Sequence, residues 1–210
     1  MKTLLQIQAS IFSNGGESSR LATQFVHQWQ ADNPGAAVIR RDLAAQPVPH
    51  LTAERFQSFL AKPEDRTAAQ QAVASFSDGL IDELERADVI VLGLPMYNFG
   101  VPSTLKAYFD HVARAGRTFK YTAAGPQGLL TGKKAVVFAT RGGLYAGTPL
   151  DSQTGYVRDF LRFLGIADVE FVYAEGLAMG DAAKSESLAK AVRATRELAA
   201  RHAPEIAAAA

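Results

Sequence analysis

The 210-residue sequence contains no cysteine, which excludes disulfide bonds, iron–sulfur clusters and thiolate nucleophiles. It also lacks an excess of either charge, since 22 lysines and arginines are balanced by 21 aspartates and glutamates. The resulting net charge of +1 gives no general attraction to nucleic acid or to an anionic membrane. No apolar run approaches the roughly 18 residues of a transmembrane helix, and the apolar start is too short for a signal peptide. These absences predict a cytoplasmic protein with neither nucleic acid nor membrane as a partner.

Several motifs for catalysis and cofactor binding are also absent. The first predicted strand is not followed by G-x-G-x-x-G, and no G-x-x-x-x-G-K-[ST] occurs, so neither a dinucleotide Rossmann site nor a P-loop is supported. Without a G-x-S-x-G elbow, a hydrolase triad is not supported. The four histidines (His27, His50, His111 and His202) form no spaced ligand set, so no metal site is predicted.

The most informative stretch that is present runs from Val89 to Pro102. It begins as an apolar, β-branched run, which is typical of a strand buried on both faces. It continues into a proline-bounded loop with the sequence Met96-Tyr97-Asn98-Phe99. An aromatic, amide-bearing loop at the end of a strand suits a flat ring with a polar edge. We therefore take flavin binding as the working hypothesis.

The hydrophobic pattern of the whole chain alternates strands and helices. Strands are predicted at 3–8, 36–42, from 89 onward, 134–140 and 169–174. Helices are predicted from 18 or 19 to about 32, then at 52–60, 66–86, 102–114, 152 or 154–164 and 182–203, with a helical end at 207–210. Between Gly116 and Lys133 we expect only a small strand at 118–121 and a turn at 125–128. The alternation predicts one α/β domain over 1–210, in which a doubly wound, five-stranded parallel sheet of order 2-1-3-4-5 is covered on both faces.

In that topology the loops after strands 1, 3 and 4 lie side by side at one edge of the sheet. The first loop, 9–19, is rich in serine and glycine and leads into a helix N-terminus, which is an anion site. The second holds the aromatic and amide groups, and the third, Arg141-Gly142-Gly143, lets backbone approach a ring closely. Each loop alone also fits an ordinary role: a helix cap, a lid over the core or a plain turn. Together they describe a site for FMN, with Phe99 and Tyr145 facing a substrate.

A family resemblance rests on these same residues. The sequence Pro95-Met96-Tyr97-Asn98-Phe99, followed by Arg141-Gly142-Gly143 and accompanied by the stretch 113–121, resembles the bacterial FMN-dependent NADH:azoreductase and NAD(P)H:quinone oxidoreductase family. The similarity extends from Leu4 to about Met179. It implies a flavodoxin-like homodimer with FMN at the dimer interface. The implied activity is ping-pong, two-electron reduction of quinones and azo compounds, with NADH or NADPH as the hydride donor.

The resemblance also implies which residues contact the cofactor and the substrate. The FMN phosphate and ribityl chain would be held by Ser10, Gly16, Glu17 and Ser18. The flavin ring would be lined by Pro95, Met96, Tyr97, Asn98 and Phe99 on one side and by Thr140, Arg141, Gly142 and Gly143 on the other. Substrate contacts would come from Asn98, Phe99, Phe119 and Tyr145. No side chain is expected to be catalytic, because the flavin carries the redox chemistry.

At one position the sequence departs from the family pattern. Family members often have a hydroxyl residue where Gly16 stands, so one hydrogen bond to the phosphate is in doubt. Two rival functions remain: a flavodoxin-type electron carrier without its own turnover, and a flavin-free binding or hydrolytic protein. Carriers of that type tend to be acidic, and the balanced charge argues against one.

Overall fold

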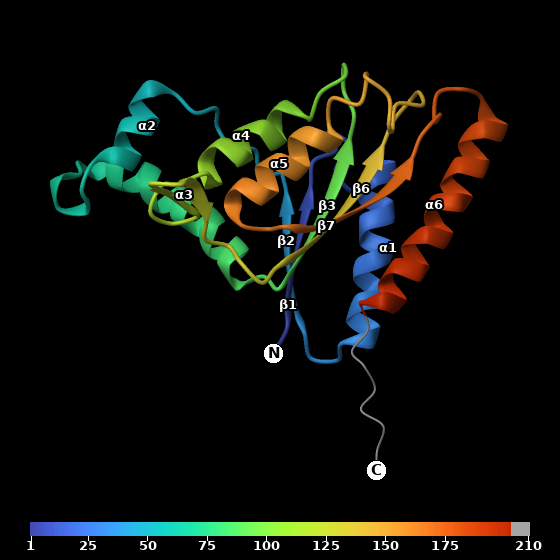
Figure 1. Ribbon diagram of the computed structural model, residues 1–210, viewed down its shortest axis with the longest axis horizontal. Helices are drawn as coiled ribbons and strands as arrows, with labels where there is room; N and C mark the ends of the chain where they lie inside the picture. The colour runs from blue at the N-terminus through green and yellow to red at the C-terminus, as the bar shows by residue number, and fades with distance from the viewer. Residues whose placement is uncertain (203–210) are drawn as a thin grey trace, which may run out of the picture.

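The computed structural model describes residues 1–202, so the predicted helical end at 207–210 lies outside the described residues. Five parallel strands form the central sheet in the order β2–β1–β3–β6–β7 (Figure 1). They are β1 (Thr3–Gln8), β2 (Ala37–Asp42), β3 (Val89–Pro95), β6 (Lys134–Thr140) and β7 (Asp168–Ala174). The five-stranded parallel sheet is therefore confirmed. Its numbering differs from the predicted 2-1-3-4-5 because two short strands intervene between β3 and β6.

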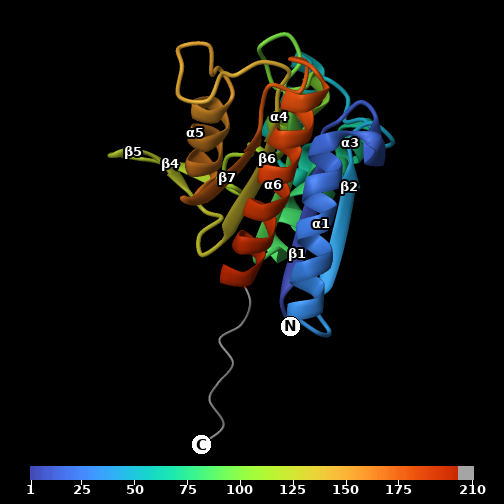
Figure 2. The ribbon, with the colours of Figure 1, turned by 90° about the vertical axis from the view of Figure 1, so that its right-hand side faces the viewer.

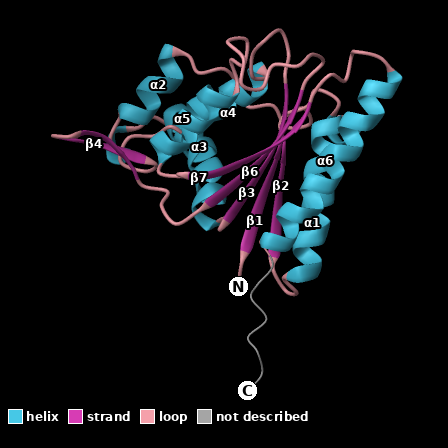
Figure 3. Ribbon diagram, turned by 45° about the vertical axis from the view of Figure 1, so that its right-hand side comes forward, coloured by secondary structure: helices cyan, strands magenta, loops and turns pink. Residues whose placement is uncertain are grey.

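Helices cover both faces of this sheet, as Figures 1 and 3 show. On one face lie α1 (Glu17–Asp32) and α6 (Asp181–Arg201). On the other lie α3 (Ala68–Arg86), α4 (Ser103–Val112) and α5 (Thr154–Leu164), with α2 (Ala53–Leu60) packed on α3. Two 3₁₀ turns, η1 (Ser13–Gly15) and η2 (Pro63–Asp65), lie after β1 and after α2. Two apolar clusters, one on each side of the sheet, form the core.

The strand and helix patterns behave largely as the sequence predicts. Every residue of β3 is buried, as expected for a β-branched strand between two neighbours. In α1, Leu21, Phe25 and Trp29 are buried along one stripe. The periodicity of α3 predicts a buried stripe through Phe76, Leu80 and Leu84. Leu80 and Leu84 are buried as predicted, but Phe76 is 42% exposed, and the buried face includes Ile81. None of the helices within 1–202 combines the length and apolarity needed to cross a membrane.

The stretch predicted to be irregular forms an antiparallel hairpin of β4 (Phe119–Thr122) and β5 (Gly125–Gly128). The hairpin projects from the body of the molecule (Figure 2). The expected turn at 125–128 is therefore wrong: the chain reverses between Thr122 and Gly125, and Gly125 has a φ of 109°. Gly128 lies directly against the backbone of Gly165 at the end of α5, where an added Cβ would lie 2.0 Å from the Gly165 nitrogen. This contact ties the base of the hairpin to the main body.

The register of the sheet brings three strand ends together. Gln8 at the end of β1 lies opposite Gly93 of β3, and Pro95 at the end of β3 lies opposite Thr140 at the end of β6. The loops that follow these strands therefore begin next to one another, at the edge where Figure 3 shows the connecting loops gathered. This is the edge at which doubly wound sheets bind ligands.

Candidate functional site

A cavity of about 320 Å³ lies where these three loops meet. It is lined by Ser10, Phe12, Gly15, Gly16, Glu17, Ser18, Pro95, Met96, Tyr97, Thr140, Arg141, Gly142 and Leu177. The structure thus brings together every predicted cofactor residue except Asn98, Phe99 and Gly143, which lie beside the cavity. Leu177 was missed by sequence reasoning, although it follows β7, whose end lies at the same edge.

The first and second loops are joined through Ser10 and Tyr97. The buried Ser10 hydroxyl accepts the backbone N–H of Phe12 at 3.2 Å and lies 3.5 Å from the Tyr97 hydroxyl. The Tyr97 hydroxyl also accepts the backbone N–H of Ile11 at 3.3 Å. One wall of the cavity is therefore fixed by hydrogen bonds between loops that are far apart in the sequence.

The N-terminus of α1 forms the part of the cavity that suits an anion. The first backbone N–H groups of a helix have no acceptor within the helix and carry partial positive charge. The Ser18 hydroxyl is buried at this end and has no hydrogen-bond partner among residues 1–202. A buried hydroxyl without a partner is costly unless a ligand satisfies it. This donor set fits the phosphate of FMN.

The glycine at position 16 has a steric reason. Gly16 is the N-cap of α1, and a Cβ added there would lie 2.2 Å from the Ser10 Oγ and 2.7 Å from its Cβ. A serine at position 16 would therefore collide with Ser10. With glycine at this position, the Ser10 hydroxyl occupies the space that a side chain at position 16 would need.

Glu17, which lines the cavity, pairs its carboxylate with two cations. It lies 3.5 Å from Arg20 Nη1 and 3.5 Å from Lys184 Nζ on α6. These two cations offset a charge that would otherwise repel a phosphate at the same helix end. Glu17 therefore lines the cavity without acting as a free anion.

The second loop makes a tight and strained turn. Tyr97 N–H donates to the Gly100 carbonyl at 3.2 Å, and Gly100 N–H donates to the Tyr97 carbonyl at 2.9 Å. The two central residues, Asn98 and Phe99, have φ values of 50° and 60°. Residues other than glycine rarely adopt this left-handed backbone conformation, and such backbone strain is concentrated at ligand sites. The turn displays the Asn98 amide and the Phe99 ring to solvent beside the cavity.

The third loop is built around a buried cation. Arg141 is fully buried, and its guanidinium donates to Asp151 at 2.7 Å, Thr154 at 3.0 Å and Glu175 at 3.2 Å. Its positive charge is therefore committed to protein carboxylates. Arg141 lines the cavity as the sequence predicts, and its contact with the flavin ring stays a prediction.

Two aromatic rings stand beside the cavity. Phe99 and Tyr145 pack edge to face, with ring centroids 5.4 Å apart. The Tyr145 ring also covers Gly143, where an added Cβ would lie 2.6 Å from the ring. The structure therefore brings together two of the aromatics that were predicted to face a substrate.

The fourth predicted substrate residue, Phe119, lies elsewhere in the single chain. It is 7% exposed at the start of β4, and its ring packs against Phe163 of α5 with centroids 4.4 Å apart. The cavity lining does not include it. Its contact with a substrate stays a prediction.

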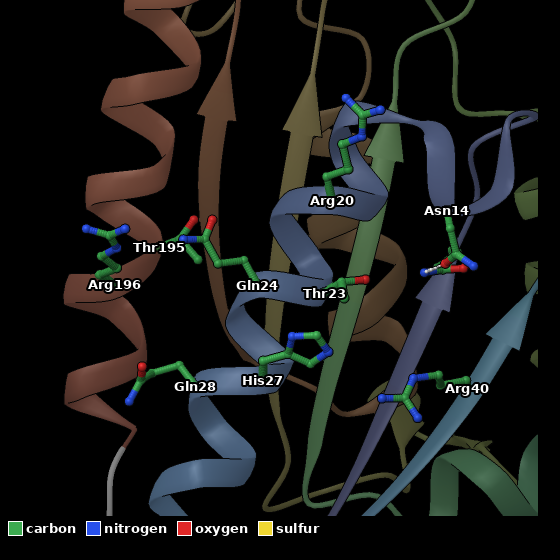
Figure 4. Close-up of a pocket in the computed structure, with 10 residues that line it drawn as sticks. Asn14, Arg20, Thr23, Gln24, His27, Gln28, Arg40, Thr195 and Arg196 are labelled. Atoms are coloured by element: carbon green, nitrogen blue, oxygen red, sulfur yellow. Dashed lines mark hydrogen bonds between the residues drawn. The ribbon is translucent and has the colours of Figure 1, made fainter.

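A larger cavity, of about 800 Å³, lies between α1, β1, β2 and α6. Figure 4 shows its lining, in which Gln8 donates to Asn14 at 2.9 Å. None of the predicted site residues lines it, and the side chains of Arg20 and Arg196 point in different directions. The smaller cavity lies at the α1 N-terminus and is lined by the three predicted loops, so we assign the cofactor site to it.

Comparison with known proteins shows the family of this chain. A family model described as a flavodoxin-like fold matches residues 1–199. A protein of Cellvibrio japonicus named FMN-dependent NADH:quinone oxidoreductase is 55% identical over 191 residues, which cover 91% of this chain and 95% of the relative. The chain belongs to this flavodoxin-like oxidoreductase family. A relative of the same name from Alcanivorax borkumensis is 53% identical over 90% of this chain and 95% of its own length.

Solved structures of azoreductases share the fold of this family member. The crystal structure of azoreductase from Bacillus anthracis superposes with a TM-score of 0.88 at 26% identity, covering 96% of this chain and all of the other. An FMN-dependent NADH-azoreductase from Bacillus anthracis, solved in complex with FMN, has a TM-score of 0.88 at 27% identity, covering 97% of this chain and all of the other. The resemblance inferred from the sequence is confirmed.

Proposed function

We propose that this protein is an FMN-dependent NAD(P)H oxidoreductase that reduces quinones and azo compounds by ping-pong, two-electron hydride transfer. The observation that carries the proposal is the cavity at the α1 N-terminus, which is lined by Ser18 and walled by an aromatic loop and a glycine loop. It is supported by relatives and neighbours named as FMN-dependent NADH:quinone oxidoreductases and azoreductases. The bound flavin supplies the ring that accepts and donates hydride.

The residues of the chain bind and orient that ring. Ser10, Gly16, Ser18 and the first N–H groups of α1 hold the phosphate, which is the usual role of a helix N-terminus. Met96 and Tyr97 line the ring on one side, and the 140–143 segment lines it on the other. The Asn98 amide and the N–H groups of Gly142 and Gly143 serve the polar edge of the ring, where they stabilise negative charge on the reduced form.

The pair of Phe99 and Tyr145 shapes the space that the nicotinamide and the acceptor occupy in turn. Both rings are apolar and partly open to solvent, and they lie beside the cavity rather than inside it. Quinones and azo compounds are flat, electron-poor acceptors that stack well against such rings. We propose Phe119 as a further substrate contact, made when a second subunit completes the site.

We also propose that the chain, 1–210, is a single domain that acts as a cytoplasmic homodimer with FMN at the interface. Large side chains are exposed on α2 and on the projecting hairpin: Phe56 and Leu60 of α2 are 50% and 67% exposed, and Tyr121 of the hairpin is 75% exposed. Exposed apolar groups of this size favour burial against another protein surface. Size-exclusion chromatography with light scattering measures the oligomeric state, and a monomer at micromolar concentration would contradict the dimer.

An absorption spectrum of the purified protein, followed by NADH and NADPH titrations, tests the function. We expect flavin bands, and turnover with both a benzoquinone and an azo dye. Bound flavin with no steady-state NADH oxidation would favour the rival electron carrier. A colourless protein that binds no added FMN would favour the flavin-free binding or hydrolytic protein.

A further inference from the structure

The segment Asp151–Thr154 lies immediately before and at the start of α5, outside the lining of the cofactor cavity. It nevertheless bonds to two of the three loops that form the cavity. Its side chains reach carbonyl groups of the second loop and the buried cation of the third.

The contacts with the second loop begin at Gln153. This side chain is fully buried, and its Nε2 donates to the Pro95 carbonyl at 2.9 Å and to the Gly100 carbonyl at 2.8 Å. These two acceptors flank the turn that contains the left-handed residues Asn98 and Phe99. The amide oxygen of Gln153 has no hydrogen-bond partner among residues 1–202. The side chain therefore leaves its acceptor unsatisfied while its amide nitrogen donates to both carbonyls of the second loop.

Ser152 adds a third contact with the same turn, because its hydroxyl donates to the Phe99 carbonyl. A strained backbone conformation persists only where the surrounding structure holds it. The hydrogen bonds from Ser152 and Gln153 reach carbonyl groups before, within and after the strained pair, so they hold its backbone in place.

The contact with the third loop comes from Asp151, which accepts a 2.7 Å hydrogen bond from Arg141. Asp151 also accepts the backbone N–H of Thr154 at 3.0 Å, which fixes the start of α5. The two loops that face each other across the cavity are thus attached to four consecutive residues.

We propose that Gln153, assisted by Ser152, is a positioning residue that holds the Met96–Phe99 turn in its strained conformation. The segment Asp151–Thr154 thereby sets the separation of the two loops between which the flavin ring binds. This proposal rests on the proposed function for its consequence in FMN binding. The restraint on the turn itself exists without the cofactor.

The test uses Gln153→Met, which keeps the size of the side chain and removes its donor, with Gln6→Met as the matched control. Gln6 is equally buried, donates to Thr23 at 2.9 Å and lies in β1 away from the cavity. Hydrogen exchange of the full-length, FMN-free protein then reports on the turn. We expect the amides of Tyr97 and Gly100 to exchange about tenfold faster in Gln153→Met, while that of Val91 in β3 changes less.

FMN titration, followed by flavin fluorescence, supplies the second measurement. We expect the Kd for FMN to rise about tenfold in Gln153→Met and to change by less than about twofold in Gln6→Met. Ser152 is exposed, so Ser152→Ala is expected to fold, and it should shift both measurements in the same direction by a smaller factor. If Gln153→Met does not fold, Ser152→Ala decides alone.

Exchange at Tyr97 and Gly100 that is unchanged in both variants, or that rises only in proportion to Val91, would overturn the proposal. A Kd that changes equally in Gln153→Met and Gln6→Met would do the same. If the wild-type protein binds no FMN, the proposed function fails, and the exchange measurement still decides whether Gln153 holds the turn.

Discussion

Arg141 Nη1 lies 3.2 Å from Glu175 Oε1, and this same carboxylate oxygen accepts the backbone N–H of Tyr145 at 2.9 Å. Glu175 follows the end of β7, so it ties the loop after β6 to the neighbouring strand. The buried guanidinium and the backbone of the third loop therefore share one acceptor. Loss of either charged group should disturb both stability and the position of Tyr145.

Replacing Arg141 should destabilise the protein strongly. Arg141→Met leaves the carboxylates of Asp151 and Glu175 without their buried cation, and breaking a buried pair in this way costs about 3–5 kcal/mol. Urea denaturation measures the free energy of unfolding. The control is Lys106→Met, which removes an exposed pair with Asp110 and should cost less than about 0.5 kcal/mol. If the free energy of unfolding falls equally in the two variants, the buried Arg141 ion pairs contribute no more to stability than an exposed pair.

The stability of the protein should depend on Asp151 in acid. Burial raises the pKa of the Asp151 carboxyl, but hydrogen bonds from Arg141 and Thr154 outweigh burial and lower this pKa below its ordinary 3.8. A lowered folded-state pKa stabilises the protein above the unfolded-state value, and the contribution is lost as pH falls through the folded-state pKa. The difference in unfolding free energy between wild type and Asp151→Asn should therefore shrink below about pH 4. A difference that stays constant from pH 7 to the acid range would contradict this assignment.

A methyl group at position 16 should weaken FMN binding. In Gly16→Ala the new Cβ meets Ser10 at distances that force Ser10 or the loop to move, so the Kd for FMN should rise about tenfold or more. Gly79→Ala is the control, because Gly79 is an exposed residue of α3, and a Cβ added there meets no atom within 4 Å beyond the backbone of its own helix. That control should leave the Kd unchanged and stabilise the helix by roughly 0.5–1 kcal/mol. Fluorescence titration of both variants tests the prediction, which fails if Gly16→Ala binds FMN like the wild type.

Removing the Ser18 hydroxyl should separate cofactor binding from stability. The hydroxyl has no partner among the described residues, so Ser18→Ala should leave the melting temperature of the FMN-free protein unchanged or slightly higher. The same change removes a donor to a charged phosphate and should raise the Kd for FMN about tenfold. Calorimetry and titration measure the two effects. A lower melting temperature with an unchanged Kd would place the hydroxyl in the fold and not in the site.

Asn98 can be tested with two substitutions that separate its amide from its backbone strain. Asn98→Ala removes the amide and keeps a Cβ at a φ of 50°, whereas Asn98→Gly removes the amide and relieves the strain. If the amide serves the flavin edge, both variants should lower the rate of flavin reduction by NADH about tenfold or more. Stopped-flow absorbance measures this rate. If flavin reduction slows in Asn98→Ala but not in Asn98→Gly, this residue acts through its backbone conformation and not through its amide.

Much of the fold was predictable because it depends on local pattern. Alternating apolar strands and amphipathic helices led to the order of elements, and the parallel doubly wound arrangement follows from that alternation. The hairpin was only half predicted, since a glycine-rich strand such as 125–128 has the composition of a turn. The exposed Phe76 was missed because periodicity defines a stripe but not which part of it a neighbouring helix covers.

The sequence by itself determined which loops line the cavity: a serine-rich loop, an aromatic loop and a glycine loop that follow strands ending at one edge. Only the tertiary structure decided how these loops are held. Arg141 faces carboxylates that lie 10 and 34 positions away, and Gln153 bonds to carbonyls more than 50 positions earlier. Hydrogen bonds across such separations depend on strand register and helix packing, which no local pattern encodes. For this reason the carboxylate partners of Arg141 and the contacts of Gln153 emerged only from the fold.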